Sequence, residues 1–143
     1  MKRYAFFSLL CAFVVAGCAN ISDALKAKDE GSVTTYNVDF EQAWKIARTV
    51  LRWEDAETIE EHKDENYMVT TVGQNFVSAG SVVAVWVEPA DKSNTKVTIV
   101  TKRKMQTNIA TGLTESTFHR RYAQAVDIVK TGKTLPSDAP ASK

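Results

Sequence analysis

The chain has 143 residues, and its 18 Lys and Arg side chains nearly balance 17 Asp and Glu side chains, giving a formal net charge of +1. This balance provides no overall attraction to nucleic acid or to anionic lipid. A hydrophobic content of 44% is ample for one core. The composition therefore predicts a single domain and no nucleic-acid partner.

The first 17 residues have the organisation of a secretory signal peptide. Lys2 and Arg3 precede an apolar stretch, residues 5–16, that is interrupted only by Ser8. The stretch is shorter than the roughly 20 apolar residues that cross a bilayer, but it fits the apolar region of a signal peptide. The alternatives are an N-terminal anchor helix or a buried core helix. The absence of a polar face, and of any charge between Arg3 and Asp23, disfavours both.

The segment VAGC, residues 15–18, resembles the lipobox of bacterial lipoproteins. The resemblance implies cleavage between Gly17 and Cys18, attachment of a diacylglyceryl group to the Cys18 sulfur, and acylation of the new N-terminus. Two or more acyl chains anchor a protein stably to a membrane that it does not span. Because Ala19 and not Asp follows the cysteine, the resemblance also implies sorting to the outer membrane, facing the periplasm.

The cysteine count agrees with this interpretation. Cys11 lies in the segment expected to be removed, so the mature chain of 126 residues retains only Cys18 and forms no intramolecular disulfide. We expect residues 18–32 to be the acylated N-terminus and a flexible tether, since they show little apolar periodicity. Residues 33–132 are the predicted domain. Residues 133–143, with Pro and small polar residues, are the predicted disordered tail.

Within the predicted domain, Asp39 is the expected N-cap of a helix over residues 39–53, and Thr114 or Ser116 caps a second helix that ends near Gly132. Five strands are expected from β-rich runs and turn residues: residues 33–38, 57–63, 66–73, 81–89 and 95–105. Residues 63–66 and 90–94 are the predicted turns of two hairpins.

The resulting order, β-α-β-β-β-β-α, predicts an α+β fold in two layers. One antiparallel sheet of about four to five strands packs both helices on a single face, because each helix has one apolar stripe. The run VVAVWV, residues 82–87, is apolar on both faces, which indicates a central strand with Trp86 under a loop or at a contact site. In the last strand, Val97 and Ile99 are expected to point inward and Thr98, Lys102 and Lys104 outward.

This layout, together with the lipobox, resembles small bacterial envelope lipoproteins. It resembles more distantly the helix-grip domains of lipoproteins that assist outer-membrane β-barrel assembly. The resemblance covers residues 33–132 and rests on the order of elements. It implies a non-enzymatic role and transfers no functional residue except Cys18.

Residues that could carry catalysis are few. His62 could join Glu60 and Asp64 at a metal or in acid–base chemistry, but a hairpin turn is where solvated charges normally lie. His119 is interpreted as a partly exposed helix residue rather than a catalytic one. The sequence contains no nucleophile-elbow motif and no phosphate-binding glycine loop. We therefore expect no enzyme, no metal and no cofactor.

Two features suggest contacts with an anion or a partner. Basic residues stand on either side of the segment 105–116, and they could meet at a lipid phosphate or an acidic surface: Lys102, Arg103, Lys104, Arg120 and Arg121. The alternative is ordinary solvated faces of a strand and a helix. Trp53, at the expected end of the first helix, could be partly exposed and anchor a partner.

These observations lead to three hypotheses. The first is a lipid-anchored, non-enzymatic accessory or scaffold domain at the outer membrane that binds an envelope protein or a lipid. The second is a small-ligand or lipid-binding domain with a pocket between helices and sheet. The third is a hydrolase that uses the region of His62 or His119.

Overall fold

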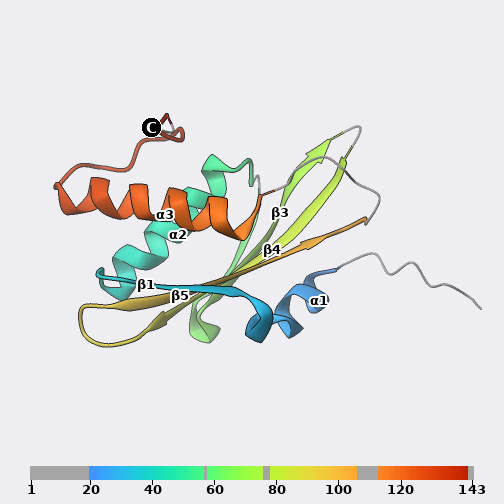
Figure 1. Cartoon of the computed structure of the whole chain (residues 1–143), viewed down its shortest axis with the longest axis horizontal. Helices are drawn as coiled ribbons and strands as arrows, with labels where there is room; N and C mark the ends of the chain where they lie inside the picture. The colour runs from blue at the N-terminus through green and yellow to red at the C-terminus, as the bar shows by residue number, and fades with distance from the viewer. Residues whose placement is uncertain (1–19, 57, 76–77, 106–112, 142–143) are drawn as a thin grey trace, which may run out of the picture.

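The computed structural model describes residues 20–56, 58–75, 78–105 and 113–141. Its order of elements is α1 (Ile21–Lys26), η1 (Lys28–Glu30), β1 (Ser32–Tyr36), α2 (Phe40–Trp53), β2 (Ile59–His62), η2 (Lys63–Glu65), β3 (Tyr67–Asn75), β4 (Ser78–Pro89), β5 (Thr95–Arg103) and α3 (Glu115–Lys130). The strands form one antiparallel sheet in the order β1-β5-β4-β3-β2. The α+β fold predicted from the sequence is confirmed (Figure 1).

Both long helices lie on one face of the sheet, as expected. Asp39 caps α2, since its Oδ1 accepts a hydrogen bond from the Gln42 backbone N–H at 2.9 Å. Thr114 caps α3 in the same way, accepting from the Thr117 N–H at 3.2 Å. Buried side chains of α2, α3 and the strands fill the space between the layers, so the main core lies there.

The central strand β4 supplies side chains to both faces. Val83, Val85 and Val87 point into the main core, because side chains alternate along a strand. Val82, Ala84 and Trp86 point to the opposite face. The predicted two-sided burial of this strand is therefore confirmed, and Trp86 is only 5% exposed.

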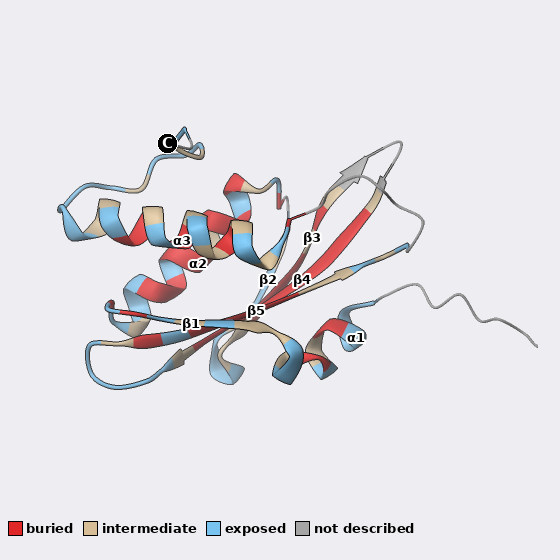
Figure 2. Ribbon diagram, in the orientation of Figure 1, coloured by how far each residue is buried: buried red, intermediate tan, exposed pale blue. Residues whose placement is uncertain are grey.

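The N-terminal segment covers that second face, and the predicted flexible tether is wrong for residues 20–31. The Asn20 side chain caps α1 and Asp23 bonds back to the Asn20 N–H, which forms a complete capping box. Ala24 and Ala27 then pack against the β4 side chains. Figure 2 shows buried segments in α1, which lies on the side of the sheet away from α2 and α3. Because this cover exists, Thr98 is buried. The alternation of side chains had predicted an outward-facing, solvated position for it.

The C-terminal segment is ordered as well, so the predicted disordered tail is wrong for residues 133–141. Leu135 and Ala139 pack against the main core. The Trp53 Nε1–H donates to the Pro136 carbonyl at 3.0 Å, and Arg121 donates to the Pro140 carbonyl. Apolar side chains at two positions and two backbone acceptors hold this segment on the helices.

Candidate functional site

One edge of the sheet is only partly covered. The four residues of β2 pair with Tyr67 to Thr70 of β3, but β3 runs on to Asn75 while paired with β4 on its other side. From Thr71 onward, β3 therefore has no second strand partner among the residues that the structure describes. An uncovered strand edge presents backbone N–H and C=O groups that can pair with another extended chain.

The way in which α2 ends explains why β2 is short. Asp55 has a left-handed backbone with φ 63°, and its N–H donates to the Arg52 carbonyl at 3.2 Å. The Ala56 N–H donates to the Leu51 carbonyl at 3.1 Å, which completes a Schellman motif. The chain therefore turns sharply after α2 and joins the sheet only at Ile59.

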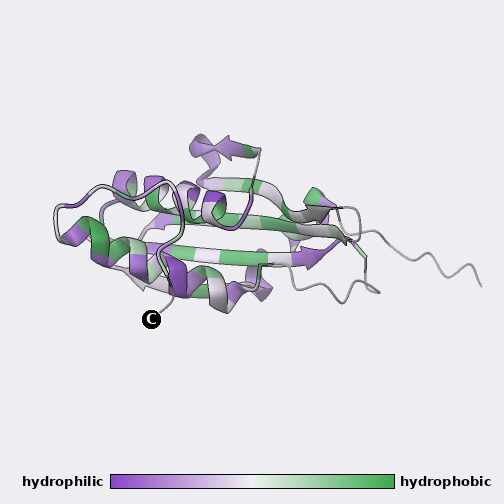
Figure 3. Ribbon diagram, turned by 90° about the horizontal axis from the view of Figure 1, so that it is seen from above, coloured by the Kyte–Doolittle hydropathy of each residue, from purple (hydrophilic) through white to green (hydrophobic). Residues whose placement is uncertain are grey.

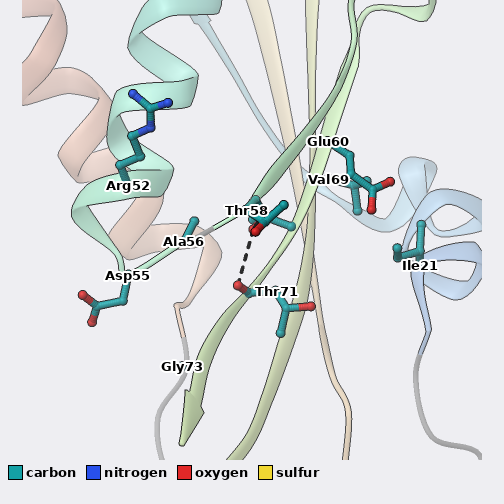
Figure 4. A pocket seen from close by; sticks show the side chains of 10 residues that line it. Ile21, Arg52, Asp55, Ala56, Thr58, Glu60, Val69, Thr71 and Gly73 are labelled. Carbon is teal, nitrogen blue, oxygen red and sulfur yellow. Dashed lines mark hydrogen bonds between the residues drawn. The ribbon is translucent and has the colours of Figure 1, made fainter.

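The turn and the uncovered end of β3 enclose a groove of about 900 Å³. Its lining combines threonine side chains, charges of both signs and small apolar surfaces: Ile21, Arg52, Asp55, Ala56, Thr58, Glu60, Val69, Thr70, Thr71 and Gly73. The Thr70 hydroxyl donates to the Thr58 carbonyl at 2.6 Å at the point where β2 begins. Arg52 and Asp55 lie on the α2 side of the strands and Ile21 on the α1 side (Figure 4).

The groove combines an uncovered strand edge with charged side chains. No group of three or more His, Cys, Asp or Glu side chains in the described part of the chain is placed to hold a metal ion. The groove instead offers one strand edge, flanked by Arg52, Asp55 and Glu60. An edge of this kind binds through backbone hydrogen bonds, and the flanking side chains select among sequences.

The five basic residues predicted to meet do not form one cluster. Lys102 pairs with Glu30 at 2.8 Å on the α1 side of the sheet. Arg121 lies on the helical side, where Glu54 is 3.4 Å away. Burial raises the pKa of Glu54, although the Arg121 charge opposes that shift.

The other three basic residues also point to different surroundings. Arg103 is next to the start of α3, beside Thr114 and Glu115. Lys104 is next to Asn20 and Ile21, and Arg120 is exposed on α3. Successive residues of β5 point to opposite faces, which separates residues that are adjacent in the sequence. Most of the connecting segment, residues 106–112, lies outside the described residues.

Trp53 is not an exposed anchor. It is 9% exposed, and its indole N–H is bonded to Pro136. The expected partial exposure of this side chain is wrong, because the C-terminal segment covers it. The hydrogen bond joins residues that are 83 positions apart in the sequence, so a local pattern could not predict it.

His62 and His119 both have structural partners. The His62 ring stacks on Tyr67 with ring centroids 4.5 Å apart. The His119 Nε2 is 3.1 Å from the Ser32 carbonyl oxygen and therefore carries a proton, which it donates. Its Nδ1 is 2.9 Å from the Tyr36 hydroxyl, the donor in this tautomer. His119 thus joins α3 to both ends of β1.

The groove residues were not found from the sequence, because the two strands of the first hairpin were expected to have nearly equal lengths. The lipidation residues Gly17 and Cys18 lie outside the described residues. Within the described part of the chain, no helix has the length and apolar character that a bilayer crossing requires. Comparison with protein-family models, curated proteins and solved structures finds no match to this chain.

Proposed function

We propose that the protein is a lipid-anchored envelope lipoprotein, held by Cys18 at the outer membrane and facing the periplasm, whose domain is a non-enzymatic partner-binding module. The occupant of its groove is an extended segment of another envelope protein, which adds a strand to β3. The single observation that carries this proposal is the uncovered β3 edge beyond Thr70, which lies directly in the groove.

The chemistry of the groove indicates what kind of segment fits. Backbone groups of the β3 edge provide hydrogen bonds that do not depend on sequence, each worth about 0.5–1.5 kcal/mol net. Arg52 and Asp55 flank one side of the edge, and Glu60 flanks the other. A segment with charged side chains of both signs therefore complements the groove better than a purely apolar one.

The alternative ligand-binding function requires a cavity between helices and sheet. That space holds buried side chains of the main core, among them Ile46, Leu51, Ile99, Phe118 and Tyr122. The groove lies at the sheet edge and is open and largely polar, which favours a peptide over a small apolar ligand.

The anchor is tested by a Cys18→Ser variant. We expect it to lose the acyl mass and to leave the membrane fraction, since a thiol is needed for thioether formation. A Ser22→Ala variant, which changes an exposed residue nearby, is the matched control and should remain anchored. A Cys18→Ser protein that stays membrane-bound with residues 1–17 attached would contradict the signal-peptide interpretation.

The strand-addition site is tested by a photo-crosslinking residue placed at Thr71, with Lys92 in the exposed β4–β5 turn as the control position. In intact cells we expect an adduct with one envelope protein from position 71 and none from position 92. Mass spectrometry of the adduct identifies the captured segment. Equal capture at both positions, or capture at neither, would refute the proposed site.

A synthetic peptide of the captured segment then distinguishes strand addition from contact nearby. We expect amide hydrogen exchange at the end of β3 to slow by about tenfold or more on binding. A Thr58→Trp variant, which fills the groove, should weaken peptide affinity about tenfold, and Lys92→Trp should not. Protection confined to other elements would mean that β3 is not the binding edge.

A further inference from the structure

The distance between the anchor and the folded domain is very short. Asn20 is the N-cap of α1, and α1 is packed on the sheet through the buried Ala24. Only Ala19 separates Asn20 from Cys18. Two residue steps span at most about 7 Å, so an acylated Cys18 leaves the domain no freedom to stand away from the bilayer.

We infer that one end of the domain, formed by the start of α1 and the end of β5, lies against the lipid headgroups as a second membrane contact. This inference rests on the lipid anchor of the proposed function. We call the surface where β5 ends the membrane-facing end: Ile21 and Lys104 lie on its α1 side, Arg103 lies on its α3 side, and Met105 follows the strand. Figure 1 shows that the N-terminal end of α1 and the C-terminal end of β5 lie at the same end of the molecule.

Contacts hold the membrane-facing end together. Lys104 shares a surface depression with Asn20 and Ile21. The Lys104 N–H donates to the Gly80 carbonyl at 3.1 Å, which ties the residue after β5 to the start of β4. The basic end of β5 and the first residue of α1 are therefore neighbours in the folded domain.

The membrane-facing end has exposed apolar side chains. Ile21 is 40% exposed and Met105 is 51% exposed. Val33, on the edge strand β1, is the only other large hydrophobic side chain with comparable exposure in the described part of the chain. Two of three such side chains thus occur at the end from which the chain leads back to the anchor. Apolar side chains at this position can enter the region between headgroups and acyl chains.

The charges at this end favour an anionic surface. Lys102 is neutralised by Glu30, but Arg103 and Lys104 form no ion pair with any described residue. The nearby carboxylates Asp23 and Glu115 accept hydrogen bonds from backbone N–H groups and form no ion pair with either cation. Figure 3 shows the hydrophilic end of β5 projecting beyond the hydrophobic centre of the sheet. Basic side chains at this position are attracted to anionic phospholipid.

The orientation of the domain on the membrane also determines where the groove opens, because Ile21 lines both the groove and the depression that contains Lys104. One end of the groove therefore opens next to the headgroups. A segment bound there lies close to the bilayer surface, which selects for the membrane-proximal part of a partner protein.

The test uses an anchor that does not depend on acylation. Residues 1–18 are replaced by a hexahistidine segment, which retains every residue of the described fold, and the protein is bound to vesicles of zwitterionic lipid with about one-fifth phosphatidylglycerol and a nickel-chelating lipid. A fluorophore is placed on single cysteines at Ser22, Met105 or Lys92. Lys92 lies in the turn between β4 and β5, at the opposite end of the sheet (Figure 1).

We expect lipid-borne quenchers to reduce the emission at positions 22 and 105 about threefold more than at position 92. An Arg103→Glu, Lys104→Glu variant should lose most of this difference, as should vesicles without phosphatidylglycerol. A Lys130→Glu, Lys133→Glu variant is the matched control, because it makes the same change of charge at two exposed positions at the C-terminal end of α3, away from the end of β5 (Figure 1).

Equal quenching at the three positions would overturn the inference, since it would mean that the domain tumbles freely at its anchor. Protection of positions 22 and 105 only by the captured peptide, without lipid, would overturn it too and would assign this surface to a protein partner. A Cys18→Ser protein that keeps its membrane attachment refutes the lipid anchor but leaves this measurement intact. The two failures are therefore distinguishable.

Discussion

At the scale of single residues, Asp55 has a backbone conformation that glycine adopts at lower cost. Its φ of 63° is left-handed, and a side chain in this region costs about 1 kcal/mol or more. Part of the gain from glycine is offset by the greater freedom of glycine in the unfolded chain. We predict that Asp55→Gly raises the free energy of unfolding by about 0.5–1 kcal/mol, measured by urea denaturation.

Gly132 provides the matched control, because α3 ends in the same motif. The Gly132 N–H donates to the Val129 carbonyl at 2.9 Å, and the Lys133 N–H donates to the Ile128 carbonyl at 3.3 Å. A Cβ at Gly132 would meet no atom within 4 Å, so Gly132→Ala should cost about 1 kcal/mol through the backbone alone. A destabilised Asp55→Gly would show that the Asp55 side chain contributes more than its backbone costs.

The structural roles of some residues could be predicted from their neighbours in the sequence, and the roles of others could not. The cap Asp39 and the helix end at Gly132 depend on neighbours within a few residues, so the sequence pattern identified them, and it narrowed the cap of α3 to Thr114 or Ser116. The burial of Trp53 depends on the distant C-terminal segment. The left-handed turn at Asp55, on which the groove depends, had no sequence signal because glycine is the usual residue there.

At the scale of elements, Gly31 allows the N-terminal segment to cross β5 closely. A Cβ at this position would lie 2.7 Å from the Ile99 carbonyl oxygen and 2.8 Å from a Val100 methyl group. The carbonyl belongs to a strand that is paired on both sides, so it cannot move aside. We predict that Gly31→Ala lowers the free energy of unfolding by about 1–3 kcal/mol, measured by urea denaturation.

The fluorescence of Trp86 reports on the same variant. Trp86 is covered by the N-terminal segment, and the Lys28 ammonium lies 5.6 Å from the centre of its ring. If the segment is displaced, the Trp86 emission should shift to longer wavelength before global unfolding. Ser22→Ala, a change at an exposed position of α1, should leave both stability and emission unchanged. A Gly31→Ala protein of native stability would mean that η1 can shift without cost.

The N-terminal segment is an element that the sequence pattern did not predict. Its six-residue helix is too short to show a periodicity, and its packing side chains are mainly alanines. The indirect signal was the run of apolar residues on both faces of β4, because Val82, Ala84 and Trp86 require a cover. The sequence predicted the central strand correctly, but not the segment that covers its second face.

At the scale of the whole molecule, the order of strands and helices follows from patterns that the sequence displays, and the groove does not. The sheet and its two long helices were predicted, because hairpins and apolar stripes are local features. The groove results from a difference in length between β2 and β3. That difference is set by where α2 ends and where the chain joins the sheet.

Two carboxylates on opposite faces of the sheet, Glu54 and Glu88, make contributions of opposite sign to the pH dependence of the free energy of unfolding. Burial raises the pKa of Glu54 above its ordinary value of 4.5, against the effect of Arg121. Burial of Glu88 acts in the same direction, but the hydrogen bond from Lys28 and the ion pair with Lys96 outweigh it and lower the pKa of Glu88. Ionised Glu54 therefore lowers stability above pH 4.5. Ionised Glu88 adds stability that is lost as the pH falls below 4.5.

Glu54→Gln and Glu88→Gln variants should separate these contributions. Relative to the unmodified protein, Glu54→Gln should increase the free energy of unfolding more at about pH 7 than at about pH 3.5, because glutamine cannot lose a proton. Glu88→Gln should reduce the free energy of unfolding more at about pH 7 than at about pH 3.5. The difference should be under about 1 kcal/mol, because the ion pairs are partly exposed. Urea denaturation at both pH values measures the two differences. The same sign for both variants would show that Arg121 stabilises ionised Glu54 more than burial destabilises it.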